Sequence, residues 1–208
     1  MQTMLQVSKL FIFALSIFLG ASSFAAPTVD GKRLDAYRLE YKDAVIPVKY
    51  VFAHADGSPC CSTSTKGKPY ILNITAPPPA ELAYSAEIER LFKENFEVEI
   101  DNESLISTPN ADYVVITMSR PAEYNKKYVP CAGGMGEERA YLLSITTSEV
   151  TVINRKFGGC GKHYQALRDS NVTGYEVSSS DPSIKAVRFV LRGNSLVRQD
   201  GTPSKESQ

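Results

Sequence analysis

Two stretches decide the fold that the sequence predicts: PAELAYSAEIERLFKENFEVEI, residues 79–100, and ADYVVITM, residues 111–118. In the first, apolar residues recur every three or four positions. This spacing predicts one amphipathic helix over about 79–95, opened by a proline that a first helical turn tolerates. Apolar and acidic residues then alternate over 96–101, as in a strand with one face in water. The second stretch is apolar on both faces, which suits only a central strand.

Most of the remaining chain has the alternating or apolar pattern of short strands separated by turn-forming segments. Strands are expected, in chain order, at 37–42, 45–54, 70–75, 96–101, 113–118, 141–146, 150–154, 174–178, 184–191 and 196–198. Residues 162–169 fit either a short helix or a strand. A helix through Leu34, Tyr37 and Tyr41 is the alternative to the first strand, but the aromatic content favours a strand. The expected fold class is therefore α+β, with one main amphipathic helix packed on a mostly antiparallel sheet of about seven to nine strands.

The first 25 residues have the pattern of a secretory signal peptide. A single positive charge at Lys9 precedes an apolar run over 10–19, and small residues lead to a cleavage point after Ala25. The apolar run is too short to span a bilayer. We expect export to the periplasm or the medium, with a retained N-terminal anchor as the alternative. Residues 26–201 then form one domain, and the polar tail 202–208 is expected to be disordered.

The exported part of the chain is almost electrically neutral. Lys9 is the only charge lost with the leader, so 22 basic residues remain against 23 acidic ones. Affinity for nucleic acid derives mainly from net positive charge, so this balance argues against a nucleic-acid partner. No later segment is apolar enough to form a transmembrane helix. The expected partner is therefore another protein.

The chain contains four cysteines, Cys60, Cys61, Cys131 and Cys160. An even number of cysteines in an exported protein indicates disulfides. A bond between the two neighbouring cysteines would need a geometry far from the usual one. We therefore expect each neighbour to pair with one of the two distant cysteines, in either arrangement. Such bonds would brace the loop at 55–68 against the loop at 121–137.

Candidate catalytic and metal-binding residues are few, and no motif supports them. A nucleophile needs a base within reach, and the pair available to an exported hydrolase is Cys160 with His163. A glycosidase-like carboxylate pair would come from Glu97, Glu99, Asp101, Glu137 and Glu138. The four thiols with His163 would suit soft Cu or Zn, although their spacing lacks the paired cysteines of structural zinc sites. We assign no catalytic residue, no metal and no cofactor.

A cluster of Tyr124, Lys126, Lys127 and Tyr128 precedes Cys131. Tyrosine and basic side chains are common components of binding surfaces. Together with export, few catalytic residue types and balanced charge, this cluster predicts a non-enzymatic protein that binds another protein or supports an envelope assembly. An inhibitor or immunity protein against a secreted hydrolase is one specific form. An exported hydrolase and a periplasmic Cu or Zn binding protein are the alternatives.

Overall fold

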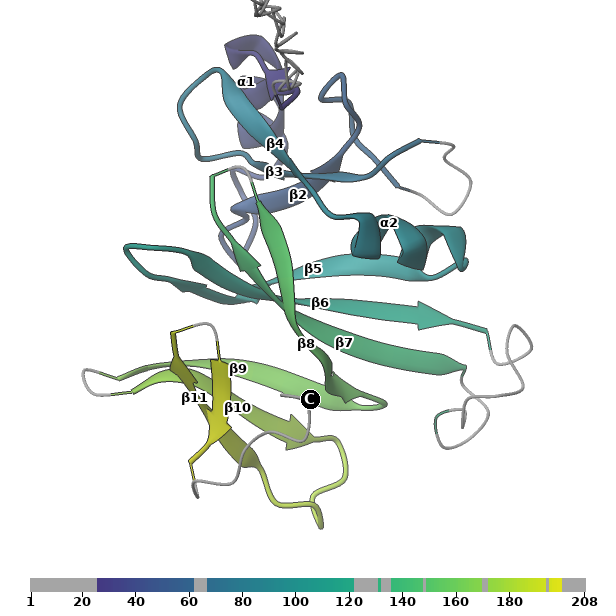
Figure 1. The fold of residues 1–208 in the computed structure, drawn as a ribbon, viewed down its shortest axis with the longest axis vertical. Helices are drawn as coiled ribbons and strands as arrows, with labels where there is room; N and C mark the ends of the chain where they lie inside the picture. Colours follow the sequence, from purple (N-terminus) through teal and green to yellow (C-terminus); the bar gives the residue numbers. More distant parts are fainter. Residues whose placement is uncertain are drawn as a thin grey trace, which may run out of the picture.

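Figure 1 shows the computed structural model, which describes residues 26–61, 67–121, 131, 136–147, 149–169, 172–193 and 195–199. Within these residues the chain forms twelve strands and two short helices. The strands make three four-stranded sheets whose strands pair in antiparallel fashion. The protein is thus mostly β, and the predicted α+β fold with one main helix on a sheet of seven to nine strands is wrong. In the described part of the chain, neither helix has the length and apolar character needed to cross a membrane.

The first sheet has the strand order β1, β4, β3, β2, and helix α1 packs against it. The bounds are Thr28–Val29 for β1, Gly31–Glu40 for α1, Tyr50–Ala53 for β2, Tyr70–Asn73 for β3 and Ala80–Tyr84 for β4. Leu34 and Tyr37 of α1 are buried against Val51, Leu72 and Leu82 of the sheet. Helix α1 and strands β2 to β4 lie at the top of the view in Figure 1.

Helix α1 replaces the strand predicted at 37–42. The side chain of Asp30 caps the helix by accepting a hydrogen bond from the backbone N–H of Arg33 at 2.9 Å. Leu34 and Tyr37 lie on one helical face and are buried, whereas Leu39, which a strand would have placed inward with Tyr37, is 65% exposed. The helical spacing therefore outweighs the strand preference of the aromatic residues.

The helix predicted over 79–95 divides into two elements. Ala80–Tyr84 forms β4, which pairs with β1 on one side and with β3 on the other. Helix α2 covers only Ala86–Lys93, with Ile88 and Leu91 buried. Leu82 fits both a helical and an alternating pattern. The segment forms a strand because it hydrogen-bonds to β1 on one side and to β3 on the other.

The central sheet has the order β5, β6, β7, β8 and carries a hydrophobic core on each face. Its bounds are Glu97–Ser107 for β5, Asp112–Arg120 for β6, Glu137–Ile145 for β7 and Val150–Gly159 for β8. On β6, Val114 and Ile116 face the core that contains α2, whereas Tyr113 and Val115 face the opposite core. The prediction of a central strand at 113–118 is confirmed.

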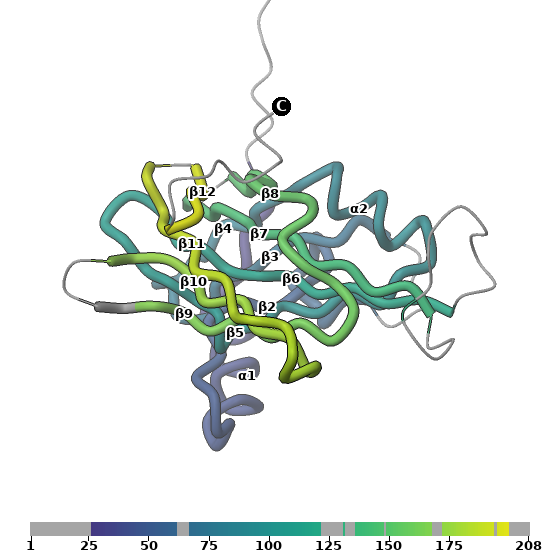
Figure 2. Tube along the Cα trace, turned by 90° about the horizontal axis from the view of Figure 1, so that it is seen from below, coloured from purple at the N-terminus to yellow at the C-terminus, as the bar shows by residue number. Residues whose placement is uncertain are grey.

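The third sheet has the order β12, β11, β10, β9 and packs on the second face of the central sheet. Its bounds are Lys162–Asp169 for β9, Val172–Ser179 for β10, Val187–Arg192 for β11 and Ser195–Arg198 for β12. Phe157 joins the two sheets, since its ring lies 5.3 Å from the rings of both Tyr164 and Tyr175. Figure 2 shows β9 to β12 lying over the central sheet. Residues 162–169 are therefore a strand and not a short helix.

The four cysteines lie at disulfide distance in two pairs, but the pairs are not those predicted. Cys60 is paired with its neighbour Cys61, and Cys131 with Cys160, whose Cα atoms are 5.3 Å apart. The backbone explains the difference. The N–H of Cys60 donates to the carbonyl of Phe52 at 3.2 Å, so this residue stays beside the first sheet, whereas Cys160 lies in the turn between β8 and β9. The predicted covalent brace between the 55–68 and 121–137 loops is not formed.

Candidate functional site

The face of the central sheet that meets the third sheet changes from apolar to polar along its strands. Near one end, Tyr113 and Val115 of β6 and Leu142 of β7 are buried against the third sheet. Further along the same face come the polar residues Glu97, Glu99, Thr117, Ser119 and Glu138, which the strand register places side by side. The third sheet covers the apolar half and leaves the polar half largely open.

The polar half forms one wall of an open groove of about 920 Å³. Five consecutive residues of β5 (99–103) and five of β9 (162–166) line it, together with Ile46 and Val48 of the segment before β2. A smaller hollow of about 270 Å³, which reaches Glu97 and Glu138, continues it and shares Glu99, Thr117, Lys162 and Tyr164 with it. We call the two hollows together the acidic groove.

Five carboxylates line the acidic groove, namely Glu97, Glu99, Asp101, Glu103 and Glu138, together with the cation of Lys162. Arg139 also lines it, but its guanidinium pairs with Glu137 and lies 5.1 Å from the ring of Phe96, in the core on the opposite face. Within the described residues, the side chains of Glu97, Glu99 and Glu103 have neither an ion pair nor a hydrogen bond. Many other acidic side chains are paired: Glu87 with Arg155, Glu89 with Lys93, and Glu176 with Arg188. The negative charge of the groove is therefore largely uncompensated.

Asp101 has a structural role in the groove wall. Its Oδ1 accepts hydrogen bonds from the backbone N–H groups of Glu103 at 3.1 Å and Ser104 at 3.3 Å. Ser104 Oγ in turn donates to the carbonyl of Asp101 at 2.6 Å and accepts from the N–H of Val115 at 2.8 Å. These bonds hold the register shift that follows Asp101 in β5. Burial raises the pKa of the Asp101 carboxyl, and the two backbone hydrogen bonds only partly oppose this.

The predicted nucleophile pair, Cys160 with His163, is not available as a site. Cys160 is bonded to Cys131, so it carries no free thiol. His163 Nε2 instead lies 3.0 Å from Ser180 Oγ, and this hydroxyl also donates to the carbonyl of Gly161 at 3.1 Å. No described residue hydrogen-bonds to the other ring nitrogen of His163. A Ser–His pair that lacks an orienting carboxylate and shares its hydroxyl with a turn does not meet the geometry of an activated nucleophile.

The predicted alternative of a soft-metal site also fails on geometry. All four thiols are used in disulfides, and His163 lies beside Ser180. In the described ranges there is no group of three or more histidine, cysteine, aspartate or glutamate side chains placed to hold a metal ion. The predicted binding cluster of Tyr124, Lys126, Lys127 and Tyr128 lies outside the described residues and stays a prediction.

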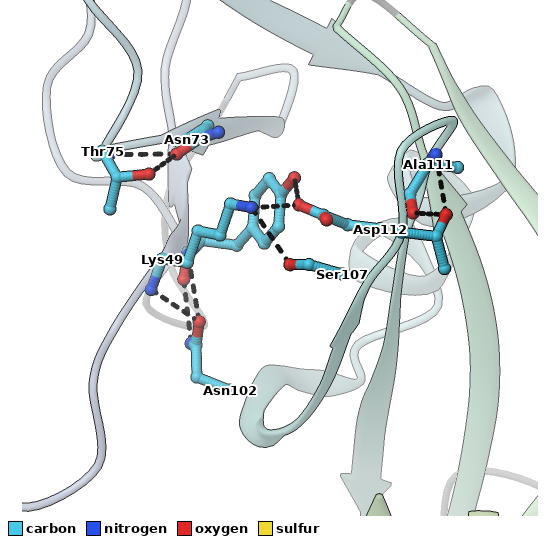
Figure 3. A network of polar contacts seen from close by, with 9 residues as sticks. Lys49, Asn73, Thr75, Asn102, Ser107, Ala111 and Asp112 are labelled. Atoms are coloured by element: carbon cyan, nitrogen blue, oxygen red, sulfur yellow. Dashed lines mark hydrogen bonds and ion pairs between the residues drawn. The ribbon is translucent and has the colours of Figure 1, made fainter. Parts of the chain in front are cut away.

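A second polar cluster joins the first sheet to the central sheet (Figure 3). Lys49 Nζ lies 2.5 Å from Asp112 Oδ2 and 3.3 Å from Ser107 Oγ. Tyr50 Oη donates to the same Asp112 oxygen at 2.5 Å. Asn102 Oδ1 accepts the backbone N–H groups of Lys49 and Tyr50, both at 2.9 Å, and its amide donates to the carbonyl of Tyr50 at 3.0 Å. The Asn102 side chain thus takes the place of a strand backbone at the start of β2.

The charges of this second cluster are fixed at neutral pH. Burial by itself would raise the pKa of Asp112, but the hydrogen bonds from Lys49 and Tyr50 outweigh it, so the pKa lies below its ordinary value of 3.8. Burial and the bond to Asp112 raise the pKa of Tyr50 far above its ordinary range. Tyr50 therefore stays protonated and Asp112 ionised. The cluster borders a pocket of about 390 Å³. Because neither Tyr50 nor Asp112 changes its protonation state near neutral pH, the cluster is suited to holding the two sheets together and not to proton transfer.

Sequence reasoning found part of these two clusters. Glu97, Glu99 and Asp101 were placed on one strand face, and the structure brings them together with Glu138. The pairing of Lys49 with Asp112 was missed. The one signal available was the charge at Asp112 within an otherwise apolar run, because such a charge needs a partner when it is buried.

Comparison of the chain with protein-family models, with curated proteins and with solved structures finds no match in any of the three. The geometry of the acidic groove and of the Lys49–Asp112 cluster therefore carries the functional argument by itself.

Proposed function

We propose that the protein is exported and binds another protein through the acidic groove, without catalysing a reaction. The observation that carries this proposal is an open groove of about 920 Å³ whose wall presents carboxylates without ionic partners. Charge complementarity across an interface speeds encounter and selects the right partner. A chain that is neutral overall and concentrates unpaired negative charge in one groove is suited to such selection.

Exposed apolar side chains at one end of the groove support the same proposal. Val45 is 100% exposed and Ile46 is 41% exposed, and Ile46 lines the groove with Val48. Apolar residues beside polar ones are the usual composition of a protein interface. Burying such a side chain fully on a partner would contribute about 1.5–3 kcal/mol before the entropic cost of association.

Several groups of the predicted hydrolase are already engaged in structural contacts. Asp101 is held in a turn by two backbone N–H groups, and Cys160 is in a disulfide. Ser180, whose hydroxyl lies 3.0 Å from His163 Nε2, donates its hydrogen bond to the backbone carbonyl of Gly161. Binding uses the groove as it stands, whereas catalysis through Asp101, Cys160 or Ser180 would require these groups to be rearranged.

A site-specific photo-cross-linker tests the binding function in the organism that makes the protein. The reactive side chain replaces Gln165, an exposed residue of β9 that lines the groove. The control position is Leu39, which is 65% exposed on α1 and does not line it. We expect a covalent adduct with one defined protein from position 165 and none from position 39. Equal labelling at both positions, or none at 165, would overturn the proposal.

Export is tested separately, by the N-terminal residue and the free thiols of the isolated protein. The protein isolated from outside the cytoplasm should begin at Ala26 and show no reactive thiol without reductant, because all four cysteines are paired. An intact leader or free thiols in that material would contradict export to an oxidising compartment.

A further inference from the structure

We infer that the partner contributes an extended segment with basic side chains at every second residue, which adds to the outer edge of β9. This inference rests on the proposed function and specifies the partner at the same groove. Its first support is the lining itself, which includes the five consecutive residues 162–166 of β9. A strand face exposes only alternate residues, so an uninterrupted run means that the groove borders the strand's edge.

The outer edge of β9 has free capacity for hydrogen bonding. All eight residues of β9, Lys162–Asp169, are in register with β10 on one side. On the other side, no strand of the described chain pairs with it, because β9 is the last strand of its sheet. The unpaired N–H and C=O groups of such an edge are a template for an added strand.

The spacing of the carboxylates specifies the side chains of the added segment. Glu97, Glu99 and Asp101 lie on the same face of β5, two residues apart. Side chains two residues apart along any strand are separated by about 6.7 Å. An extended segment with lysine at every second position therefore repeats at the same distance as these carboxylates.

Peptide binding to the complete mature chain tests the inference. The probe is an acetylated eight-residue peptide of alternating lysine and threonine with a fluorescent label, and the readout is anisotropy. One comparison peptide has the four lysines adjacent, and another has every second backbone nitrogen methylated. We expect the alternating peptide to bind at least about tenfold more tightly than either, because only it offers both the charge spacing and the ladder donors. Its binding should also slow hydrogen exchange of the β9 amides.

Matched variants locate the binding. Glu97→Gln with Glu99→Gln should weaken the alternating peptide about fivefold to tenfold. Glu40→Gln with Glu81→Gln removes the same charge from exposed positions that do not line the groove and should change nothing. Equal affinity for all three peptides would overturn strand addition. Unchanged affinity with self-association of the Glu97/Glu99 variant would mean that the carboxylates only keep the edge strands apart.

The two proposals can fail separately. If the alternating peptide does not bind, but the cross-linker at Gln165 still captures one defined protein, the extended basic segment is wrong and the binding function stands. If neither occurs, both are wrong.

Discussion

Replacing Lys49 with methionine tests how the first sheet is anchored to the central sheet. Lys49 Nζ and Tyr50 Oη both lie 2.5 Å from one oxygen of Asp112. Methionine keeps most of the volume of the lysine stem but removes the charge. The carboxylate of Asp112 would then keep the hydroxyls of Tyr50 and Ser107 but have no cation, in a site where 10% of its side chain is exposed. We expect the free energy of unfolding to fall.

The size of this loss follows from burial. Removing one partner of a fully buried ion pair costs about 3–5 kcal/mol, whereas exposed pairs contribute at most about 1 kcal/mol. The side chain of Lys49 is 25% exposed and that of Asp112 10%, so the pair lies between these limits. We expect a loss of about 2 kcal/mol at pH 7. Asp112→Asn in the same variant should restore part of it, because the neutral amide needs no cation.

The contribution of the Lys49–Asp112 pair to the free energy of unfolding should depend on pH. The pKa of Asp112 is below 3.8 in the folded chain, so its ion pair stabilises the fold above that pH and stops doing so as the pH falls through the folded pKa. Without Lys49, burial raises the pKa of Asp112, and the carboxyl takes up its proton at a higher pH. The difference between wild type and Lys49→Met should therefore be largest at pH 7 and shrink below about pH 4.

Urea unfolding at both pH values, with the disulfides intact, measures this difference. Tyr50→Phe is the matched variant, because it removes a neutral donor and leaves the ion pair. A loss at pH 7 below about 0.5 kcal/mol for Lys49→Met would show that the pair is solvated like a surface pair. A loss that stays constant from pH 7 to pH 3 would refute the electrostatic reasoning, since methionine would then act through packing alone.

Three further substitutions test local features of the fold. Gly158→Ala places a Cβ 2.0 Å from the hydroxyl oxygen of the buried Tyr164, so unfolding in urea should show a loss of about 1–3 kcal/mol. Asn102→Ala leaves two N–H groups at the start of β2 without an acceptor, and it should cost about 2 kcal/mol and speed hydrogen exchange there. Cys131→Ser with Cys160→Ser opens a link across 29 residues, and it should lower stability by about 3–4 kcal/mol on the chain-entropy model.

Each of these substitutions has a matched control. Gly31→Ala brings the new Cβ no closer than 3.5 Å to Pro78 and should leave stability unchanged. Asn73→Ala breaks only a local, exposed turn and should cost less than Asn102→Ala. Replacing Cys60 and Cys61 by serine opens no long loop, so it should cost about 1 kcal/mol or less. If a control substitution lowered stability as much as the test substitution it is matched with, the specific contact would not be the cause of the loss.

The sequence predicted those elements whose pattern allowed one interpretation. The strand at 113–118 was found because only a central strand is apolar on both faces. The segment 80–84 allowed two interpretations, since Leu82 fits both helical and alternating spacing, and one of its two partner strands, β1, lies about fifty residues earlier in the chain. At 37–42 the aromatic residues favoured a strand, but the cap at Asp30 favoured a helix. At 80–84 the pairing with other strands overruled the local pattern, whereas at 37–42 one local signal, the helix cap, outweighed another, the strand preference of the aromatic residues.

The candidate site was predictable to a similar degree. Alternation placed Glu97, Glu99 and Asp101 on one face, since side chains two residues apart in a strand share a face. That this face becomes the wall of a groove depends on where β9 runs, more than fifty residues later. The pairing of Cys60 with Cys61 was excluded on the usual Cα separation, but their shared position beside β2 keeps them from the distant cysteines.

The carboxylates of the acidic groove predict opposite effects on stability and on binding. Glu97 and Glu99 are about 6.7 Å apart on one strand face, and two such charges in water repel by about 0.6 kcal/mol before screening by salt. Glu99→Gln should therefore stabilise the isolated protein by a few tenths of a kcal/mol and, at the same time, weaken its cross-linking and peptide binding. Urea unfolding at low and high salt, run beside the binding assay, measures both, and the gain should vanish at high salt. If Glu99→Gln lost stability, this carboxylate would serve the fold, and the case for a binding groove would lose its electrostatic basis.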